Sequence, residues 1–160
     1  RRKNMQVAIQ KDLQLSTSVQ NVWTLFRDIN RFAGLVPGVA DIHVQKEEEK
    51  ETYLAHLLDK VGPFKIEMTV EIKLVQLVED QLLEAQLSGF DKGGKNRMKG
   101  NLQAKLSQLE NNMTQVKFYA NIEVLGKLAG LGASPIRRRT DQHFSEFARR
   151  IEQQFQSESL

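Results

Sequence analysis

The sequence predicts an α+β fold in which a curved antiparallel sheet of six to seven strands is wrapped on a long C-terminal helix. Two patterns support this prediction. Between residues 39 and 124, apolar and polar side chains alternate with period two, as in antiparallel strands that face water on one side. Over residues 136–155, apolar side chains recur at three- and four-residue spacing, which is typical of a long amphipathic helix.

A strand and two short helices precede the main run of strands. In residues 7–15 the apolar side chains fall mostly on odd positions, so one face of this strand is apolar. The Ser-Thr-Ser segment at 16–18 offers side-chain oxygens that can cap a helix over 19–26. A second, shorter helix over 29–34 ends in glycine, and Val-Pro-Gly at 36–38 turns the chain back into strands.

The later strands are joined by short turns. Residues 64–74 carry apolar side chains on even positions and Lys, Glu or Thr on every odd position. The same alternation recurs in 53–61, 83–90, 98–109 and 116–124, and Gly-Pro, Glu-Asp, Gly-Gly and Asn-Asn pairs separate successive strands. Such turns predict that strands consecutive in sequence are neighbours in the sheet.

The final helix is the element long enough to cover the concave apolar face of a sheet that twists and curls. A helix laid on a curved sheet touches it along a line, so the remaining volume is filled either by large side chains or by a ligand. Small or flexible inward residues such as Ala55, Gly89, Met68 and Met98 permit a cavity. Ordinary close packing is the alternative.

Length and composition limit the class of protein. The 160 residues suit one domain, expected over 6–156, with 1–5 as a short extension or a cloning remnant. Charged or amide side chains interrupt every apolar stretch, so no membrane span is expected. The chain has no cysteine, and a cytoplasmic location is the default expectation. Its 23 basic and 20 acidic residues are interleaved, which argues against a nucleic-acid partner.

Histidines and carboxylates give little sign of metal binding or catalysis. His43, His56 and His143 lie on separate predicted elements, and no His-x-x-x-His or Glu-x-x-His spacing occurs, so no metal site is expected. Asp59 falls in phase with the apolar residues of its strand, which would point a carboxylate inward near the sheet edge. An inward carboxylate needs a partner or a raised pKa, and a solvated acid at the strand end is the alternative. Without convergent acids and bases, we expect no catalytic residues and no enzymatic activity.

Several short motifs occur together in a recognisable order. They are Val-Trp at 22–23, Val-Pro-Gly at 36–38, Lys-Val-Gly-Pro-Phe-Lys at 60–65, Lys-Gly at 99–100 and Gly-Lys-Leu-Ala-Gly-Leu-Gly at 126–132. With these motifs the chain, from about residue 7 to 155, resembles the family of the carbon monoxide dehydrogenase G subunit. That family is a branch of the START-like, pollen-allergen-like helix-grip superfamily, also called SRPBCC.

The resemblance implies a hydrophobic cavity under the C-terminal helix and a role accessory to a molybdenum-containing carbon monoxide dehydrogenase or a related redox enzyme. Members of the family are linked to membrane recruitment of the enzyme and to carrying quinones. Two segments depart from the family pattern, Asn-Asn-Met-Thr at 111–114 and the three arginines at 137–139. Some members carry a C-terminal anchor beyond the helix, and stable anchoring is not expected from the residues up to Leu160.

Strand phase and the apolar stripe of the helix give the residues expected to contact an apolar ligand. These residues are Trp23, Leu35, Tyr53, Leu57, Ile66, Met68, Val70, Leu87, Met98, Phe118, Phe144, Phe147, Ala148 and Ile151. Basic residues beside an apolar loop can contact an anionic membrane or a partner, although solvated charges are the simpler interpretation. The candidates for such contact are Leu128, Leu131, Arg137, Arg138 and Arg139.

Three functions are compatible with these patterns. The leading hypothesis is a non-enzymatic carrier of a quinone- or lipid-like molecule, which needs no further cofactor and serves a carbon monoxide dehydrogenase-type enzyme. It would be cytoplasmic, or peripheral at the inner face of the membrane. The second is a polyketide-cyclase- or hydrolase-like enzyme on the same fold, which requires acid and base groups in the cavity. The third is a ligand-free assembly factor.

Overall fold

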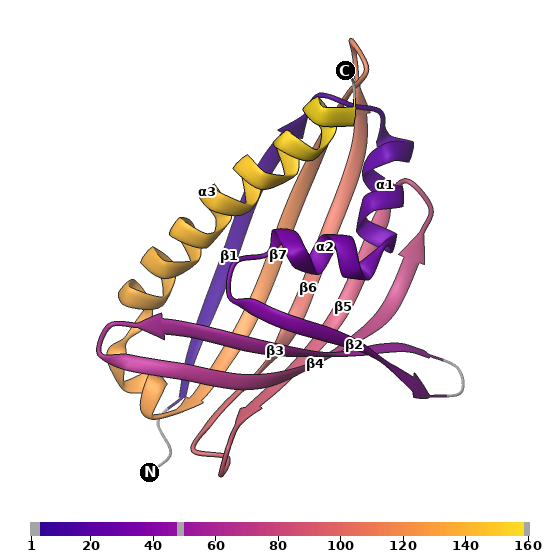
Figure 1. Cartoon of the computed structure of the whole chain (residues 1–160). Helices are drawn as coiled ribbons and strands as arrows, with labels where there is room; N and C mark the ends of the chain where they lie inside the picture. The colour runs from indigo at the N-terminus through magenta and orange to yellow at the C-terminus, as the bar shows by residue number, and fades with distance from the viewer. Residues whose placement is uncertain (1–3, 48–49, 159–160) are drawn as a thin grey trace.

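The computed structural model describes residues 4–47 and 50–158 (Figure 1). Seven strands, three α-helices and one 3-10 helix make up this part of the chain. In chain order they are β1 (Asn4–Leu15), α1 (Val19–Arg27), α2 (Ile29–Leu35), β2 (Val39–Glu47), β3 (Lys50–Val61), β4 (Phe64–Val78), β5 (Leu82–Asp91), β6 (Asn96–Leu109), β7 (Met113–Gly126), η1 (Lys127–Leu131) and α3 (Ala133–Glu158).

The strands form one antiparallel sheet in the order β1-β7-β6-β5-β4-β3-β2. From β2 to β7 the chain meanders as the short turns predict, and β1 pairs with β7 at the opposite edge from β2. The sheet bends strongly, so that β2, β3 and β4 cross below the middle of the sheet while α3 runs beside β1 (Figure 1). The predicted α+β fold, with its six to seven strands, two short helices and long C-terminal helix, is confirmed.

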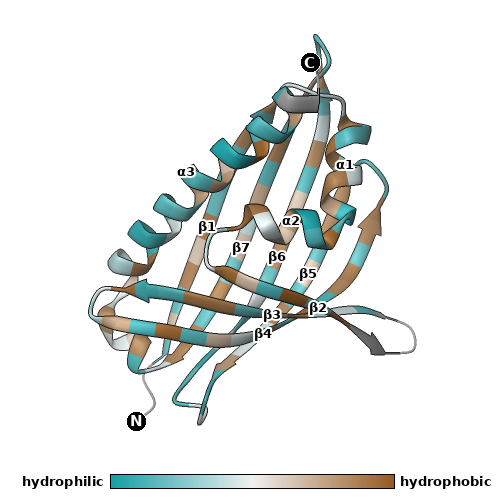
Figure 2. Ribbon diagram, in the orientation of Figure 1, coloured by the Kyte–Doolittle hydropathy of each residue, from teal (hydrophilic) through white to brown (hydrophobic). Residues whose placement is uncertain are grey.

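Alternation of side chains decides which face of each strand is buried. In β1 the odd positions point inward, and Val7 and Leu15 keep at most 1% of their surface exposed. Figure 2 shows hydrophobic and hydrophilic residues alternating along the strands and a largely hydrophilic outer side of α3. The inner face of the sheet and the inner side of α3 therefore form the apolar interior.

The larger packed cluster lies where α1, α2 and the second half of α3 meet the sheet. Leu15, Val22, Val116 and Ile151 are fully buried there. Burying a side chain such as Ile151 contributes roughly 1.5–3 kcal/mol. The predicted cap of α1 is present, since the hydroxyl of Ser18 accepts a hydrogen bond from the Asn21 amide at 3.3 Å. This cluster fixes the C-terminal half of α3 on the sheet.

A smaller cluster packs at the other end of α3. It joins Val61 of β3 and Val124 of β7 to Leu128 and Ala129 of η1. The glycine-rich segment 126–132, expected as a loop or a frayed helix start, contains the 3-10 helix η1, and α3 then begins at Ala133. None of the helices in the described residues is long and apolar enough to cross a membrane.

Candidate functional site

A cavity of about 230 Å³ lies beneath the first half of α3, beside the smaller cluster. Its walls come from β1, β3, β4, β6 and β7, from η1 and from one face of α3. The strands contribute mainly apolar side chains, namely Val7, Ile9, Leu57, Val61, Ile66, Met68, Met98, Ile122 and Val124. The strand side of the cavity is therefore mostly hydrocarbon and thioether, which favours an apolar ligand.

Gly89 of β5 makes room for the two methionines of this cavity. A Cβ atom at position 89 would lie 2.7 Å from Cγ of Met98 and 2.8 Å from Sδ of Met68. Only glycine allows both side chains to cross the strand there without moving. Methionine adapts to irregular shapes, so this part of the wall can adjust to a ligand.

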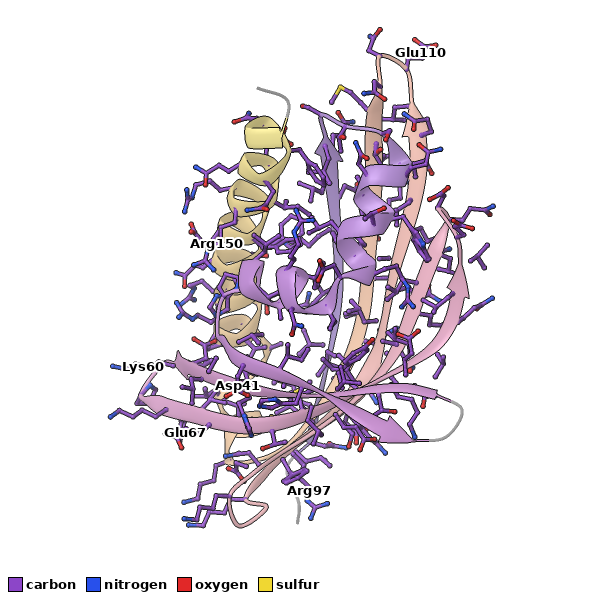
Figure 3. All side chains as sticks on the ribbon, turned by 45° about the vertical axis from the view of Figure 1, so that its right-hand side comes forward. Asp41, Lys60, Glu67, Arg97, Glu110 and Arg150 are labelled. Atoms are coloured by element: carbon purple, nitrogen blue, oxygen red, sulfur yellow. The ribbon has the colours of Figure 1, made fainter. Side chains whose placement is uncertain are left out.

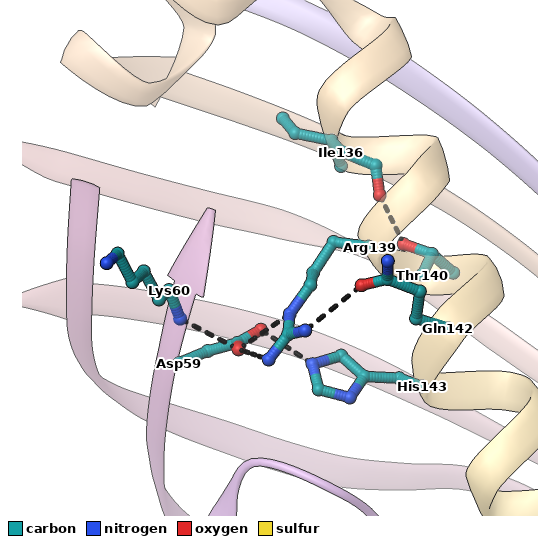
Figure 4. Close-up of polar contacts among 7 residues, drawn as sticks. All are labelled: Asp59, Lys60, Ile136, Arg139, Thr140, Gln142 and His143. Carbon is teal, nitrogen blue, oxygen red and sulfur yellow. Dashed lines mark hydrogen bonds and ion pairs between the residues drawn. The ribbon is translucent and has the colours of Figure 1, made fainter. Parts of the chain in front are cut away.

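The polar part of the cavity wall is a cluster of three side chains, Asp59, Arg139 and His143, which we call the Asp59 cluster (Figure 4). Both Nε and Nη2 of Arg139 donate to Oδ1 of Asp59, at 2.9 and 2.7 Å. Nε2 of His143 lies 2.7 Å from Oδ2 of the same carboxylate. The cluster ties β3 to α3 across the cavity.

Local sequence explains how the cluster assembles. Asp59 shares its inward phase with Leu57 and Val61, so its strand carries the carboxylate into the interior. Arg139 and His143 are four residues apart on α3, which places them on the same face of the helix. The Asp59 side chain is 10% exposed, compared with 38% for Arg139 and 26% for His143. The carboxylate is thus the innermost charge of the site.

Hydrogen bonds decide the charge of Asp59. Burial of its carboxyl favours the neutral form, but donors on Arg139, His143 and the Lys60 amide outweigh burial and lower the pKa of Asp59 below its ordinary value. The group is therefore an ionised carboxylate at neutral pH. Because an ionised carboxylate only accepts hydrogen bonds, Nε2 of His143 is the donor in their contact.

A second, smaller cavity of about 70 Å³ lies beneath α1 and α2. Tyr53 and Arg27 line it, and both bind Glu51 at its rim. Arg27 pairs with both oxygens of Glu51, at 2.5 and 3.0 Å, and the Tyr53 hydroxyl donates to Glu51 at 2.7 Å. Burial and the bond to Glu51 raise the pKa of Tyr53 to about 12, so the phenol stays neutral at ordinary pH.

Aromatic side chains of α3 and β7 pack together beside the smaller cavity. Phe144 follows His143, which lines the larger cavity, and its ring centroid is 6.0 Å from that of Phe118, which lines the smaller one. Phe147 packs at 6.0 Å from Phe118 and at 6.2 Å from Phe144. Phe118 thus joins Phe144 and Phe147 to the wall of the smaller cavity.

The predicted ligand contacts divide between cavity walls and packed core. Leu57, Ile66, Met68 and Met98 line the larger cavity. Tyr53 and Phe118 line the smaller one. The residues that line neither cavity are Trp23, Leu35, Val70, Leu87, Phe144, Phe147, Ala148 and Ile151.

Most residues outside the cavity walls are in the core for one reason. The apolar periodicity predicts that these side chains point inward. In the structure, Leu35, Phe147 and Ile151 are buried in the larger cluster, and Trp23 and Phe144 pack against that cluster. Periodicity cannot separate an inward residue that packs from one that faces empty space. Strand phase predicts the inward direction of Asp59, but it does not reveal Arg139 and His143 as the partners of that carboxylate.

The residues predicted for membrane or partner contact do not form one exposed patch. Leu128 is 8% exposed within the smaller cluster, and Arg139 belongs to the Asp59 cluster. Arg137 donates to the carbonyl oxygen of Ala8 in β1 at 2.9 Å. Arg137 and Arg138 are both exposed and Leu131 is half-buried, so these three remain the candidates for surface contact.

The outer face of the sheet carries a wide groove of about 640 Å³, which includes Leu87 and shares Val7 and Ile122 with the apolar cavity. Acidic residues such as Glu71 and Glu123 and basic residues such as Lys73 and Lys99 line it together. Its mixed charge favours neither an anionic nor a cationic ligand. The groove contrasts with the apolar cavity on the inner face.

A curved antiparallel sheet that holds a C-terminal helix over an apolar cavity is the START-like helix-grip fold. A conserved protein from Geobacillus kaustophilus matches with TM-score 0.83 and 17% identity, over 94% of this chain and 96% of that one. A START superfamily protein from Mycobacterium smegmatis matches with TM-score 0.70 and 11% identity, over 94% and 97%. An aromatase/cyclase from Streptomyces matches with TM-score 0.53 and 12% identity, over 74% and 68%.

Sequence comparison then gives the family. Residues 12–156 match the family of the carbon monoxide dehydrogenase G subunit (CoxG), and the chain belongs to that family. This confirms the resemblance inferred from the short motifs. No curated protein matches the chain by sequence.

Proposed function

We propose that the protein binds an apolar small molecule of quinone or lipid type in the cavity beneath α3, without transforming it. The observation that supports this most strongly is the cavity of about 230 Å³ with apolar walls and one polar corner. Family membership supports it as well. The chain then acts as a carrier or a delivery protein for the bound molecule.

The two parts of the cavity suggest how a ligand would lie. The apolar walls would take a ring or an alkyl segment, and the adaptable side chains of Met68 and Met98 would follow its shape. At the polar corner, Asp59 and Gln142 accept hydrogen bonds from three of the five N–H groups of Arg139, which leaves two that a carbonyl oxygen can accept. A quinone combines a flat apolar ring with such oxygens, which is why we favour it over a simple alkane chain.

The size of the cavity limits how much of the ligand it encloses. Pockets for drug-sized ligands usually measure about 300–1,000 Å³. A volume of about 230 Å³ is smaller, so we propose that it takes a head group or a chain segment rather than a whole lipid. The remainder would extend through the opening or displace the aromatic rings behind it.

The charges of the Asp59 cluster support binding over catalysis. A general acid needs a proton at working pH, but the lowered pKa of Asp59 leaves it ionised. Its two oxygens are held by Arg139 and His143, which limits its availability as a base. A cyclase-like enzyme is the second candidate, because a histidine paired with a carboxylate faces an apolar cavity. Conversion of a bound polyketide would favour that alternative.

Filling the cavity with a larger side chain tests whether the ligand binds there. We expect Leu57→Trp to weaken binding of a short-tailed quinone at least tenfold, because the indole would occupy the cavity beside Met68. Isothermal titration calorimetry and native mass spectrometry of the purified chain measure the effect. Leu58→Trp is the matched control, since Leu58 is the next residue of β3 and is 51% exposed on the outer face. Equal affinity for both variants, or none for the wild type, contradicts the proposal.

We further propose that the protein brings its ligand, or a carbon monoxide dehydrogenase-type molybdenum enzyme, to the membrane surface. Family membership and the exposed Arg138 near η1 support this step. A basic residue near an anionic surface contributes about 1 kcal/mol. The test is flotation of anionic vesicles mixed with this chain and the purified carbon monoxide dehydrogenase-type enzyme. Arg138→Glu is expected to reduce the amount of the chain recovered with the vesicles roughly tenfold. Arg149→Glu, on the other half of α3, is the control, and equal losses contradict this surface.

A further inference from the structure

Three metal-binding side chains meet on the outer face of the sheet, away from the apolar cavity. They are Asp41 and His43 of β2 and His56 of β3, and their nearest ligand atoms all lie within 4.8 Å of one another. Nδ1 of His56 is 2.5 Å from Oδ1 of Asp41, and Nε2 of His43 is 3.5 Å from the same oxygen. Figure 3 marks Asp41 on β2, at the front of the sheet.

An irregularity in strand pairing brings these residues together. Val39 pairs with Leu57, but after a bulge at Ala40 the register shifts and Asp41 pairs with His56. Because side chains alternate along a strand, the shift sends Asp41 and His43 outward while Ile42 stays opposite the buried Ala55. Without the bulge, Asp41 would share the inward phase of Val39. The bulge thus places two β2 ligands on the same face as His56.

The distances suit a first-row divalent metal ion. Two ligands about 2.0–2.1 Å from a tetrahedral ion lie about 3.3 Å apart. The His43–Asp41 separation of 3.5 Å is close to this value, whereas the His56–Asp41 pair at 2.5 Å would have to open. The two imidazoles, whose ligand atoms lie within 4.8 Å of each other, would adjust together with it. Their side chains are between 47% and 69% exposed, so packing does not oppose such an adjustment.

We propose that Asp41, His43 and His56 bind one divalent transition-metal ion, with zinc the best match to two imidazoles and one carboxylate. Three protein ligands leave a coordination position for water or for a donor from another molecule. β2 is an edge strand of the sheet, so the open position faces accessible surface. The ion would also clamp β2 to β3 beside the bulge.

This site is distinct from the Asp59 cluster. His143 lies on α3 and points to the inner face, where Arg139 shares its carboxylate partner. His43 and His56 belong to the outer face of neighbouring strands. The sequence contains only these three histidines, so a metal ion at the proposed site should affect two of them and spare the third.

The test is a zinc titration of the full chain, free of any polyhistidine tag. Imidazole NMR signals report on each histidine, and calorimetry gives stoichiometry and affinity. We expect one ion per chain, with shifts at His43 and His56 and none at His143. His43→Gln, His56→Gln and Asp41→Asn should each weaken zinc binding at least tenfold. Asp12→Asn, an exposed carboxylate on β1, should leave it unchanged.

Several results would overturn the site. These are the absence of saturable binding, an affinity that the three substitutions leave unchanged, and a response confined to His143. Urea unfolding without zinc shows whether each variant is folded, so a loss of binding can be separated from a loss of structure. Zinc should also raise the thermal midpoint of the wild-type chain and not that of His56→Gln, because only a bound ion stabilises the folded state.

Discussion

At the scale of single residues, Asp59 shows how a polar group is accommodated in an apolar interior. An ionised carboxylate that is 10% exposed would be costly alone, and it is retained here because two side chains and one amide donate to it. Its pairing with Arg139 and His143 joins the strand and the helix on either side of the cavity. Asp59 therefore serves both folding and the polar corner of the site.

The lowered pKa of Asp59 gives a pH-dependent prediction. A carboxyl group whose pKa is lower in the folded chain stabilises the fold above its ordinary pKa of about 3.9, and that contribution is lost as pH falls through the folded value. We expect Asp59→Asn to lower the free energy of unfolding by roughly 1–3 kcal/mol at pH 7. The difference should shrink near pH 3. Urea unfolding at the two pH values measures it.

Asp12→Asn is the control for this prediction, because Asp12 is an exposed carboxylate on the outer face of β1. It should change the unfolding free energy by less than about 0.5 kcal/mol at either pH. If Asp59→Asn were equally destabilising at pH 7 and pH 3, the ionised form of Asp59 would not be the source of the stabilisation.

At the scale of elements, the sequence predicts what depends on local pattern. Alternation indicates the strands and the inward phase of Leu57, Met68 and Met98, because burial on one face imposes a period of two. The apolar stripe of α3 begins at Ile136, but the helix itself begins at Ala133, since Pro135 is tolerated in the first turn of a helix. Local pattern thus predicts most elements and part of the cavity.

What local pattern cannot predict is the relation between elements. Arg139 and Asp59 are 80 residues apart, and their contact depends on where α3 crosses β3. The sequence alone does not predict the proposed metal-binding residues, for a similar reason. Asp41 and His43 are two apart in a strand and so share a face, which is a signal in the sequence, but His56 joins them only through the shifted register. Register and crossing positions are tertiary properties.

At the scale of the whole molecule, packing is uneven along α3. The second half of the helix is fixed by Phe147, Ile151 and Phe155 in the larger cluster. The first half spans the cavity and contacts the sheet through the Asp59 cluster, Ile136 and polar bonds from Arg137 and Asp141 to β1. Protein interiors are normally close-packed. A helix seated firmly at one end and over a cavity at the other is suited to admit a ligand at its less packed end.

Phe144 lies where these two regions meet, so it should set the length of ligand that the protein accepts. Removing its ring in Phe144→Ala would open the larger cavity toward Phe118 and the smaller one. We expect at least a tenfold gain in affinity for a long-tailed quinone relative to a short-tailed one, measured by calorimetry. The fold should lose roughly 2–4 kcal/mol of stability.

Phe155→Ala separates this effect from general loosening of the protein. Phe155 is 3% exposed, lies on the same helix and packs in the larger cluster, so its loss should cost a similar amount of stability. It is remote from both cavity walls and should leave the preference for tail length unchanged. If both variants shifted the preference equally, the ring of Phe144 would not be the barrier, and a long tail would have to leave the cavity through its opening to solvent.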